Sequence, residues 1–566
     1  MCWSLINLGY RTIAKAIEGE IPSNHRMNKL IQFYHTIRYL KLIQLINRVS
    51  RKFRKVAFSA PCLKQKSCSI PWRNYPVLPS CYQGDRQFKF LNVVDTISDW
   101  NDETKAKLWL YNLHYFDDLN QTNWQDRTLV HTNLITTWIE QNSRMEGNGW
   151  EPYTISLRTV NWIKWFLSGN NPKEEWLSSL SLQVQALDQQ LEYHLLGNHL
   201  FANAKGLVFA GCFFDGKLAE AWLRRGLSIL AKEIPEQILS DGGNFELTPM
   251  YHNTILADML DLYQLSLVYP NLITKQTSSY WLESIKKMFS WAELMEHPDG
   301  DVSFFNDSAI GIAPKLEVLR EYASNLNIDL PVLQDNRVNF LKQSGYVIVK
   351  VGDKKLILDA AKVGPDYIPG HAHADTLSFE LSIGEQRVFV NSGTSVYGLS
   401  DERLRQRKTE SHNTVVVDGE DSSEVWGGFR VARRAYPSKP LITDDGQCVK
   451  VECAHKGYMR LPGKVIHKRE WQLRQESLTI LDTLIGSFNS AQAHYHLHPN
   501  IDVLNDGDDI ILQLPNGSQY QVNTHGVDAV VVDCTWHPEF GVSIDNQKLI
   551  LNFQQNKASF VLERVL

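Results

Sequence analysis

Hydrophobic residues recur with helical spacing through the first half of the chain and with strand spacing through the second. Between about Leu108 and Met295, apolar side chains return every three or four residues, which gives each of several helices one apolar stripe. Successive helices joined by short polar turns predict a large all-α domain. The stripes lie in the segments Leu157–Leu167, Trp176–Leu195, Leu218–Ile234, Ile255–Val268 and Trp281–Met295.

The hydrophobic period changes near Gln343. Runs such as SGYVIVKVGDKKLILDAA and TLSFELSIGEQRVFVNSG are rich in strand-forming residues, and Gly-Asp, Gly-Glu and Asp-Gly turns separate them. Because the strands follow the helices instead of alternating with them, the pattern indicates separate domains and not an α/β fold. We therefore predict an α+β multidomain chain, with a helical domain at residues 85–334 and an antiparallel β-sandwich at residues 335–566.

Residues 1–84 form a third region, which we expect to be a basic helical arm. The chain has 566 residues and a net charge of −5, yet residues 21–84 hold twelve Lys and Arg and no Asp or Glu, which leaves a net charge of −17 on the rest. The segment Leu30–Val49, followed closely by RKFRK, has the pattern of a basic amphipathic helix, which can lie on an anionic membrane surface. A helix packed against the main body accounts for the pattern equally well.

Composition narrows the class of protein. The basic segment carries no nucleic-acid recognition motif, and no run of 18 apolar residues is present to cross a membrane. The eight cysteines include no C-x-x-C pair, so they are expected to be free or buried thiols. Residues 1–19 lack the pattern of a signal peptide. We therefore expect a cytoplasmic protein or one peripheral to the membrane, with a periplasmic location as the alternative.

Two polar motifs interrupt the helical half. LLGNHLFANAKGL places Asn198 and His199 where the long helix is expected to end, and an Asn in that place is commonly a helix cap. DGGNFELTPMYHNTILADML places Glu246, Tyr251 and His252 beside a glycine-rich helix entry. A tyrosine acts as a base only when nearby positive charge favours the phenolate, and otherwise it lines a core.

Histidines gather in the β half. GHAHADTLSFEL places His371 and His373 two residues apart at the mouth of a strand, so their side chains are expected on one face. His412 opens a later strand in SHNTVVVDG, and Asn391 ends the strand between them. Histidine transfers protons near neutral pH and also binds metals. His373, Asn391 and His412 are therefore candidate Zn²⁺ ligands, although histidines that cap strand ends without a metal explain the pattern as well.

Together these motifs resemble the heparinase II/III-like family of polysaccharide lyases. The resemblance covers roughly residues 100–500, and it rests on the G-N-H turn at 197–199, the Tyr-His pair at 251–252, HAHAD at 371–375, N-S-G-T at 391–394 and SHNTVVVDG at 411–419. It implies an incomplete α/α toroid joined to an antiparallel β-sandwich, and cleavage of an acidic, uronic-acid-containing polysaccharide by β-elimination. Related chains with segments like NLHYFDDL, here residues 112–119, belong to surface-polysaccharide gene clusters, which implies a role in making or turning over such a polymer.

The resemblance also assigns catalytic roles to residues of this sequence. Asn198, helped by His199, would bind and neutralise the uronate carboxylate. Tyr251 would abstract the C5 proton or protonate the leaving oxygen, with His371 as its partner in proton transfer. These three residues, Asn198, Tyr251 and His371, form the predicted catalytic constellation.

The resemblance implies that His373 and His412 hold a mainly structural metal, for which zinc is the candidate. The third ligand in the family is usually Asp, and this chain has Asn391 in that place. Loss of one anionic charge lowers the expected affinity for a cation. No organic cofactor is expected.

Further side chains are candidates for substrate binding beside the predicted catalytic residues. Arg158 in ISLRTVNW could bind a substrate carboxylate bidentately, or it could form an ion pair on a helix surface. Arg405 in RLRQRK could line an acidic-polymer groove, or it could stand in a solvated turn. Glu246 and His252 flank Tyr251 in the sequence.

Two other functions remain open at this point. A toroid glycoside hydrolase needs two carboxylates that flank the scissile bond, and Glu246 with Asp241 or Asp307 are the available pairs. A non-catalytic polysaccharide-binding or assembly protein would use the basic arm for docking.

Overall fold

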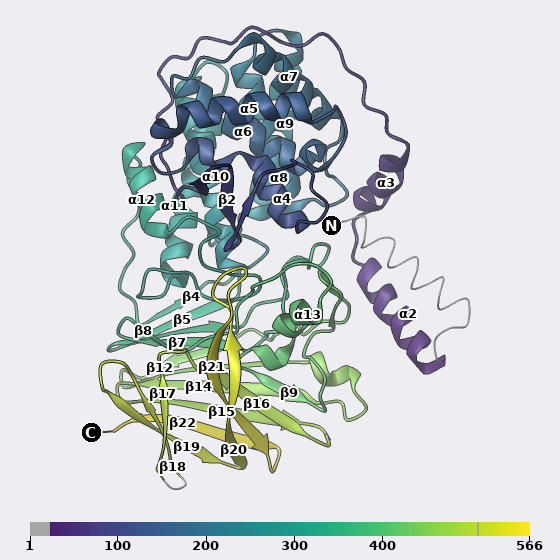
Figure 1. Ribbon diagram of the computed structural model, residues 1–566. Helices are drawn as coiled ribbons and strands as arrows, with labels where there is room; N and C mark the ends of the chain where they lie inside the picture. Colours follow the sequence, from purple (N-terminus) through teal and green to yellow (C-terminus); the bar gives the residue numbers. More distant parts are fainter. Residues whose placement is uncertain (1–22, 507–508, 566) are drawn as a thin grey trace.

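The computed structural model describes residues 23–506 and 509–565. A helical domain lies end to end with a β domain, and the amino-terminal segment runs along one side of both (Figure 1). The expectation about a signal peptide in residues 1–19 falls outside the described residues. Within them, no helix has both the length and the apolar character needed to cross a bilayer.

The helical domain is the predicted incomplete α/α toroid, in which consecutive helices pack against one another, as α8 does against α9 and α10 against α11. Each predicted apolar stripe lies in one of these helices, and the buried faces meet in a core rich in tryptophan. The helices are α4 (Lys107–Tyr115), α5 (Thr128–Gln141), α6 (Pro152–Leu167), α7 (Glu174–Gln189), α8 (Gly197–Phe213), α9 (Lys217–Gln237), α10 (Pro249–Val268), α11 (Lys275–Met295) and α12 (Leu316–Asn325).

Two helix boundaries differ from the predicted ones. Helix α7 ends at Gln189, six residues before the end of its predicted stripe, and the G-N-H turn begins α8 instead of ending α7. Asn203 lies buried within α8, where its Oδ1 accepts the backbone N–H of Glu192 and its Nδ2 donates to Ser156. The buried amide thus ties the α7–α8 turn to α6.

The β domain contains three antiparallel sheets and a short ribbon, as its alternating pattern predicts. Strands of the largest sheet show alternate buried and half-buried residues, because one face packs inward and the other meets water. The first sheet has the strand order β4 (Val338–Phe340), β5 (Tyr346–Val351), β6 (Lys354–Asp359), β7 (Phe379–Ile383), β8 (Gln386–Phe389), and the second has the order β20 (Val527–Trp536), β21 (Ile544–Phe553), β16 (Ala491–His496), β9 (Val415–Val417). The largest sheet has the order β12 (Leu441–Asp444), β13 (Cys448–His455), β14 (Ile466–Arg474), β15 (Ser477–Ile485), β22 (Lys557–Arg564), β19 (Gln519–His525), β18 (Asp509–Gln513), β17 (Asp502–Asp506). The ribbon consists of β10 (Val425–Trp426) and β11 (Arg430–Val431).

The sheet β4–β8 joins the two domains, since both of its faces are buried. Val347 and Val349 of β5 point into the sandwich core, whereas Tyr346 and Ile348 pack with Trp291 of α11. The phenol of Tyr346 donates to the carbonyl of Leu247, at 2.8 Å. An apolar interface of this kind holds the helical domain against the β domain and fixes the side chains that meet at the boundary.

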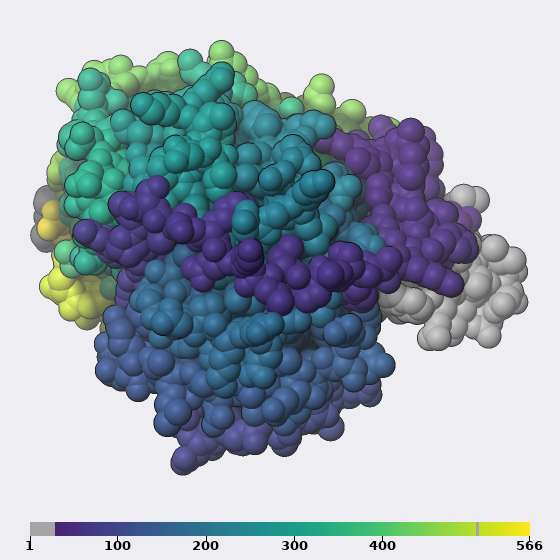
Figure 2. Space-filling model, turned by 90° about the horizontal axis from the view of Figure 1, so that it is seen from above, coloured from purple at the N-terminus to yellow at the C-terminus, as the bar shows by residue number. Residues whose placement is uncertain are grey.

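In its described part, from residue 23 onward, the basic arm holds two helices where one was expected. The expected helix Leu30–Val49 is interrupted, with α2 (Ser23–Ile37) and α3 (Leu42–Ser50) followed by a 3₁₀ turn at Arg51–Phe53. Residues 54–80 are extended and pack across the helical domain, where they form a continuous band in Figure 2. Trp72 from this segment lies in the helical core. The chain then forms a small sheet of β1 (Tyr82–Gly84), β2 (Gln87–Phe90) and β3 (Val93–Thr96).

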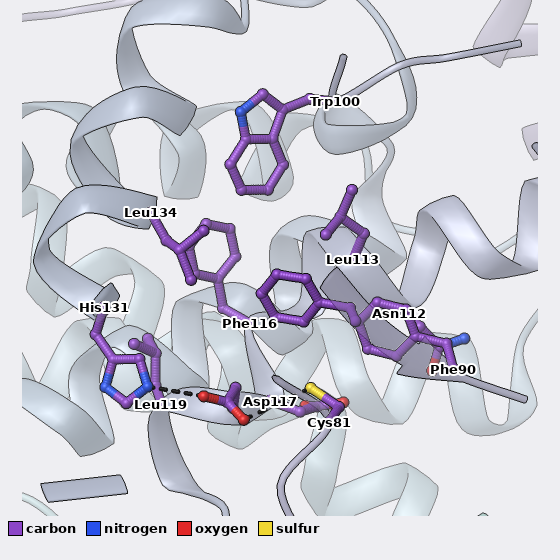
Figure 3. Close-up of a pocket in the computed structure, with 12 residues that line it drawn as sticks. Cys81, Phe90, Trp100, Asn112, Leu113, Phe116, Asp117, Leu119, His131 and Leu134 are labelled. Atoms are coloured by element: carbon purple, nitrogen blue, oxygen red, sulfur yellow. Dashed lines mark hydrogen bonds and ion pairs between the residues drawn. The ribbon is translucent and has the colours of Figure 1, made fainter. Parts of the chain in front are cut away.

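The NLHYFDDL segment, residues 112–119, is part of the helical framework. It ends α4 and enters a 3₁₀ turn through Phe116, whose φ is 62°. Asp118 accepts hydrogen bonds from Arg127 and from His131 Nε2, the latter at 2.9 Å. Asp118 and His131 border a small space, drawn in Figure 3 with the rings of Trp100 and Phe116. It has a volume of about 10 Å³ and admits no more than a water molecule. The part of the segment around Asp118 therefore belongs to the core of the helical domain.

Candidate active site

Tyr251 and His371 face each other across the boundary between the two domains. Tyr251 stands in the first turn of α10, where its backbone N–H donates to the N-cap side chain of Thr248. His371 lies in the loop before β7, so the β domain supplies it. The two rings are 4.2 Å apart between centroids, and both residues are half-buried. The structure therefore brings together two of the predicted catalytic residues from positions 120 apart in sequence.

Asp307 holds His371 in one orientation. Its Oδ2 is 2.9 Å from His371 Nδ1, and its Oδ1 is 2.8 Å from Nε2 of His373. Arg403 donates to both oxygens, at 2.6 Å for Oδ2. Burial alone would raise the pKa of Asp307, but Arg403 and the two imidazoles hold that pKa well below its usual value. Since Asp307 is a carboxylate, the Nδ1–H of His371 donates to it, and Nε2 is the ring nitrogen left for proton transfer.

Tyr251 is placed to remain a neutral phenol. Burial raises its pKa above the ordinary value, and the charges of Asp307 and Glu246 raise it further. Its hydroxyl is 3.1 Å from the hydroxyl of Tyr397, whose ring lies 4.9 Å from the Arg403 guanidinium. A tyrosine that acts as a base needs a lowered pKa. The surroundings act in the opposite direction, so this phenol is suited to donate a proton.

The amino-terminal end of α8 presents donors beside this pair. Asn198 is half-buried, and its backbone N–H bonds the Glu246 carboxylate, which lies 3.7 Å from His371 Nε2. His199 stacks on Tyr153 at 4.4 Å and has Nδ1 3.3 Å from Glu192. Backbone N–H groups and the helix dipole at such an end favour bound anions. Asn198, His199 and Glu246 therefore lie where a carboxylate-bearing sugar would meet His371.

The predicted zinc ligands meet, but they do not complete a metal site. His373 Nδ1 and His412 Nε2 are 3.2 Å apart, close to the spacing of about 3.3 Å that two nitrogens on one tetrahedral Zn²⁺ would have. The amide oxygen of Asn391 accepts the backbone N–H of Asn413, and its buried Nδ2 has no hydrogen-bond partner among the described residues. The group left free is a donor, which cannot bind a cation, and the described part of the chain holds no cluster of three His, Cys, Asp or Glu suited to a metal. This donor set does not fit zinc.

Two predicted substrate-binding residues are structural. Arg158 is fully buried and donates to the carbonyls of His114 and Gly149 and to the Gln183 side chain, so it cannot reach a substrate. His252 is also fully buried: it stacks on Trp291 at 4.3 Å, and its Nε2 is 2.9 Å from the carbonyl of Met288. Both predictions were wrong, because helical spacing does not reveal which face of a helix is covered.

Arg405 is the third predicted substrate-binding residue whose expected role the structure changes. It lies in α13 (Asp401–Arg407), and its guanidinium is 2.7 Å from Glu402 and 2.8 Å from His537 Nε2. Its side-chain partners are Glu402, Thr535 and His537, whereas Arg403, two residues earlier, bonds Asp307 of the site. The basic run contributes to the site through a residue other than the predicted one.

The carboxylate pairs that a glycoside hydrolase would need are not free. Asp241 accepts the backbone N–H groups of Gln343 and Ser344, each at 2.8 Å. Asp307 is fully buried, and both of its oxygens bond Arg403 and a histidine. A hydrolase requires one carboxyl group that protonates the leaving oxygen and another that faces the sugar. Glu246 has no such partner here, so the geometry does not favour hydrolysis.

The sequence did not predict Arg403 or Tyr397 as members of the site, and it offered Asp307 only as a carboxylate of the rival hydrolase. Asp307 lies in a loop without hydrophobic period, and Tyr397 follows the N-S-G-T run by three residues. The pattern of the chain gives no signal that these residues meet His371. A conserved Asp–Arg pair in an alignment of relatives would be the first usable sign.

Comparison with known proteins agrees with the fold and the motifs. The chain matches the family model described as the heparinase II/III N-terminus over residues 37–328, and the one described as heparinase II/III-like, C-terminal, over residues 334–561. The chain belongs to the heparinase II/III-like family. A solved structure of heparinase III superposes on this family member with a TM-score of 0.65 at 18% identity, covering 98% of this chain and 92% of that one, and a second heparinase III gives 0.62 at 19% identity, covering 82% and 80%.

The match to curated relatives covers only part of each relative's length. A heparin-sulfate lyase of Bacteroides stercoris is 25% identical over 419 residues, which are 68% of this chain and 59% of that protein. A heparin-sulfate lyase of Bacteroides thetaiotaomicron is 24% identical over 404 residues, or 62% and 55% of the two chains. The chain thus spans less than two thirds of the length of these relatives.

Proposed function

We propose that the protein is a polysaccharide lyase that cleaves a uronic-acid-containing polysaccharide by β-elimination. The observation that carries the proposal is the Tyr251–His371 pair, 4.2 Å apart, in which Asp307 leaves His371 Nε2 free to accept a proton. Membership of the heparinase II/III-like family and the names of the curated relatives support the same reaction class.

In the proposed reaction His371 is the base and Tyr251 is the acid. His371 Nε2 takes the C5 proton, the C5–H electrons form the C4–C5 double bond, and the C4–O bond breaks. The Tyr251 hydroxyl gives its proton to the leaving oxygen, and the resulting phenolate recovers a proton from the protonated imidazole beside it. Glu246, 3.7 Å from Nε2, stabilises the imidazolium in between.

A proton on C5 of a uronate is weakly acidic, because its removal adds a second negative charge to the carboxylate. The Asn198 amide and the amino-terminal end of α8 would hydrogen-bond that carboxylate, and one such donor contributes about 3–4 kcal/mol. A positioned acid or base adds roughly 10²–10⁴-fold in rate. Donors and proton-transfer groups are therefore needed together, and this site supplies both.

Ultraviolet absorbance of the product tests the reaction, because elimination leaves a conjugated unsaturated uronate and hydrolysis does not. The panel of substrates should include glycosaminoglycans, alginate and bacterial surface polymers. We expect Tyr251→Phe and His371→Ala to abolish the absorbance change while polymer binding persists. Tyr280→Phe, on the exposed side of α11, is a matched control that should keep full activity.

Reducing ends that appear without absorbance would refute elimination and favour a hydrolase. Polymer binding without any cleavage, unchanged in both variants, would favour a non-catalytic binding protein. We further propose that the polymer is a surface polysaccharide of the producing cell, because related chains with a segment like residues 112–119 belong to surface-polysaccharide gene clusters. Altered length of that polymer in a strain carrying His371→Ala is the expected result.

A further inference from the structure

Helix α3 is oriented with its apolar face outward. Leu42, Ile46 and Val49 lie on one side of the helix and are 71%, 56% and 62% exposed, and Phe53 in the following turn is 79% exposed. A helix that packs on a protein body normally buries such a stripe. In this chain the apolar stripe of α3 faces away from the protein body instead.

The polar face of the arm contacts the body instead. Gln44 is buried and donates to the carbonyl of Tyr367, at 3.2 Å. Lys41 forms an ion pair with Glu236 at 2.7 Å, and Arg51 lies 2.7 Å from His194 Nε2. These bonds fix the rotation of α3 about its axis, so the outward direction of the apolar face is a built feature.

Helix α2 continues the same outward surface. Its residues Leu30, Tyr34 and Ile37 follow helical spacing and are 47%, 58% and 39% exposed. Thr36, which lies between them in sequence, accepts a hydrogen bond from Trp426 of the β domain. The two helices lie on one side of the molecule (Figure 1), where α3 contacts the helical domain and α2 contacts the β domain. Their apolar side chains stay exposed.

We propose that the arm, residues 23–55, docks on an anionic membrane surface. Residues 21–84 hold twelve Lys and Arg without a single acid, while the rest of the chain is net acidic. An amphipathic helix with an apolar face and flanking cations is the chemistry that binds the boundary between headgroups and acyl chains. Each cation near an anionic bilayer adds about 5-fold to the partition constant.

Charge favours this occupant over a second copy of the chain. In a pair of arms placed face to face, Lys52 and Lys55 and their neighbours would meet cations of the other copy, and like charges repel. An acidic polysaccharide would satisfy the cations but would leave the apolar stripe in water. A membrane with anionic lipid satisfies both.

Flotation with lipid vesicles tests the proposal on the full chain. Vesicles of phosphatidylcholine with about 30 mol% phosphatidylglycerol are compared with phosphatidylcholine alone. We expect binding to the anionic vesicles and little to the neutral ones. Lys52→Gln with Lys55→Gln should weaken binding about 30-fold, and Leu42→Ser with Ile46→Ser and Val49→Ser should weaken it at least about 10-fold.

Matched controls carry the same changes on exposed residues outside the arm. Leu129→Ser with Val332→Ser replaces side chains that are 81% and 96% exposed, and Lys275→Gln with Lys557→Gln removes two exposed cations. Both controls should bind as the parent protein does. Equal binding to neutral vesicles, no binding at all, or equal losses in the controls would overturn the proposal.

Two further results would assign the surface to another partner. A dimer in lipid-free sedimentation that the triple serine variant converts to a monomer would show that a second copy covers the face. Retained vesicle binding in the Lys52→Gln, Lys55→Gln variant, together with lost polysaccharide binding, would show that the arm holds polymer. Because lipid binding is measured without substrate, none of these outcomes depends on the lyase activity.

Discussion

Replacement of Asp307 by Asn is the sharpest test of how the site works. The substitution keeps the shape of the side chain and removes one negative charge from a carboxylate that is fully buried. Arg403, also fully buried, then keeps its positive charge without a partner. Breaking a buried ion pair in this way costs about 3–5 kcal/mol of folding free energy. We expect a loss of that size in urea unfolding at pH 7.

Catalysis should fall for a second reason. An amide can no longer hold His371 in the tautomer with the proton on Nδ1, and loss of the equivalent carboxylate from a catalytic triad lowers the rate by about 10⁴. The rate of ultraviolet absorbance increase, measured at a temperature where the variant is folded, should fall by at least about 10³. The Michaelis constant should change much less, because Asp307 has no exposed atom to offer a substrate.

A substitution at a second buried Asp in the β domain distinguishes a loss of folding stability from a loss of the His371 orientation. Asp482 bonds Arg469 at 2.7 Å and His467 Nε2 at 2.7 Å, and all three residues are buried outside the site. Asp482→Asn should therefore destabilise the protein as Asp307→Asn does, yet leave the rate of the folded enzyme unchanged. If Asp307→Asn keeps the parent rate within about 10-fold, or if both variants lose equal activity, the orienting role of Asp307 is refuted.

Three other predictions follow from single sites. Asn391→Asp should create a zinc site with two histidines and one carboxylate, so that about one equivalent of zinc is retained after dialysis, whereas the parent chain retains little; equal zinc in both would contradict the fit argued above. Burial lowers the pKa of His252 to about 3, so its contribution is complete above its unfolded value of about 6.5 and is lost as the pH falls towards 3. Other buried histidines, such as His114 and His494, lose stability in the same direction, so the test is the difference between variants: from pH 7 to pH 5, His252→Gln should lose about 2 kcal/mol less stability than the parent chain. Arg158→Met should lower stability by about 3 kcal/mol because three acceptors lose their donor, while the Michaelis constant of the folded enzyme stays the same.

Much of the fold follows from local pattern. The apolar stripes identify the helices of the toroid, and the change of period near Gln343 separates the β domain, because both depend on the spacing of neighbours along the chain. Helix ends were less predictable, as at α7, because the buried Asn203 amide and not a local capping signal secures the turn. The orientation of α3 was not predictable, since amphipathic spacing does not tell which face meets the body.

The residues of the candidate site also differ in how far the sequence predicts them. His371 and Tyr251 stand in short motifs of distinctive composition, and the structure places them together. Arg158 and His252 looked equally suitable in sequence, but tertiary packing covers them completely. Whether a polar side chain faces substrate or carbonyl groups of its own protein is decided by elements far away in sequence, and a single chain carries no record of that.

The most informative residue, Asp307, had only a minor place in the sequence argument, yet it sets both sides of the proposed proton transfer. Its hydrogen bond from His371 Nδ1 leaves Nε2 as the ring nitrogen that takes the C5 proton in the proposed reaction. Its negative charge also adds to the effect of burial in raising the pKa of Tyr251, which keeps that phenol a donor. Two ionisable groups whose surroundings push them towards opposite roles are what acid–base catalysis needs. One buried carboxylate, held ionised by Arg403, thus accounts for how two neighbouring aromatic residues divide the work of accepting and giving a proton in the proposed reaction.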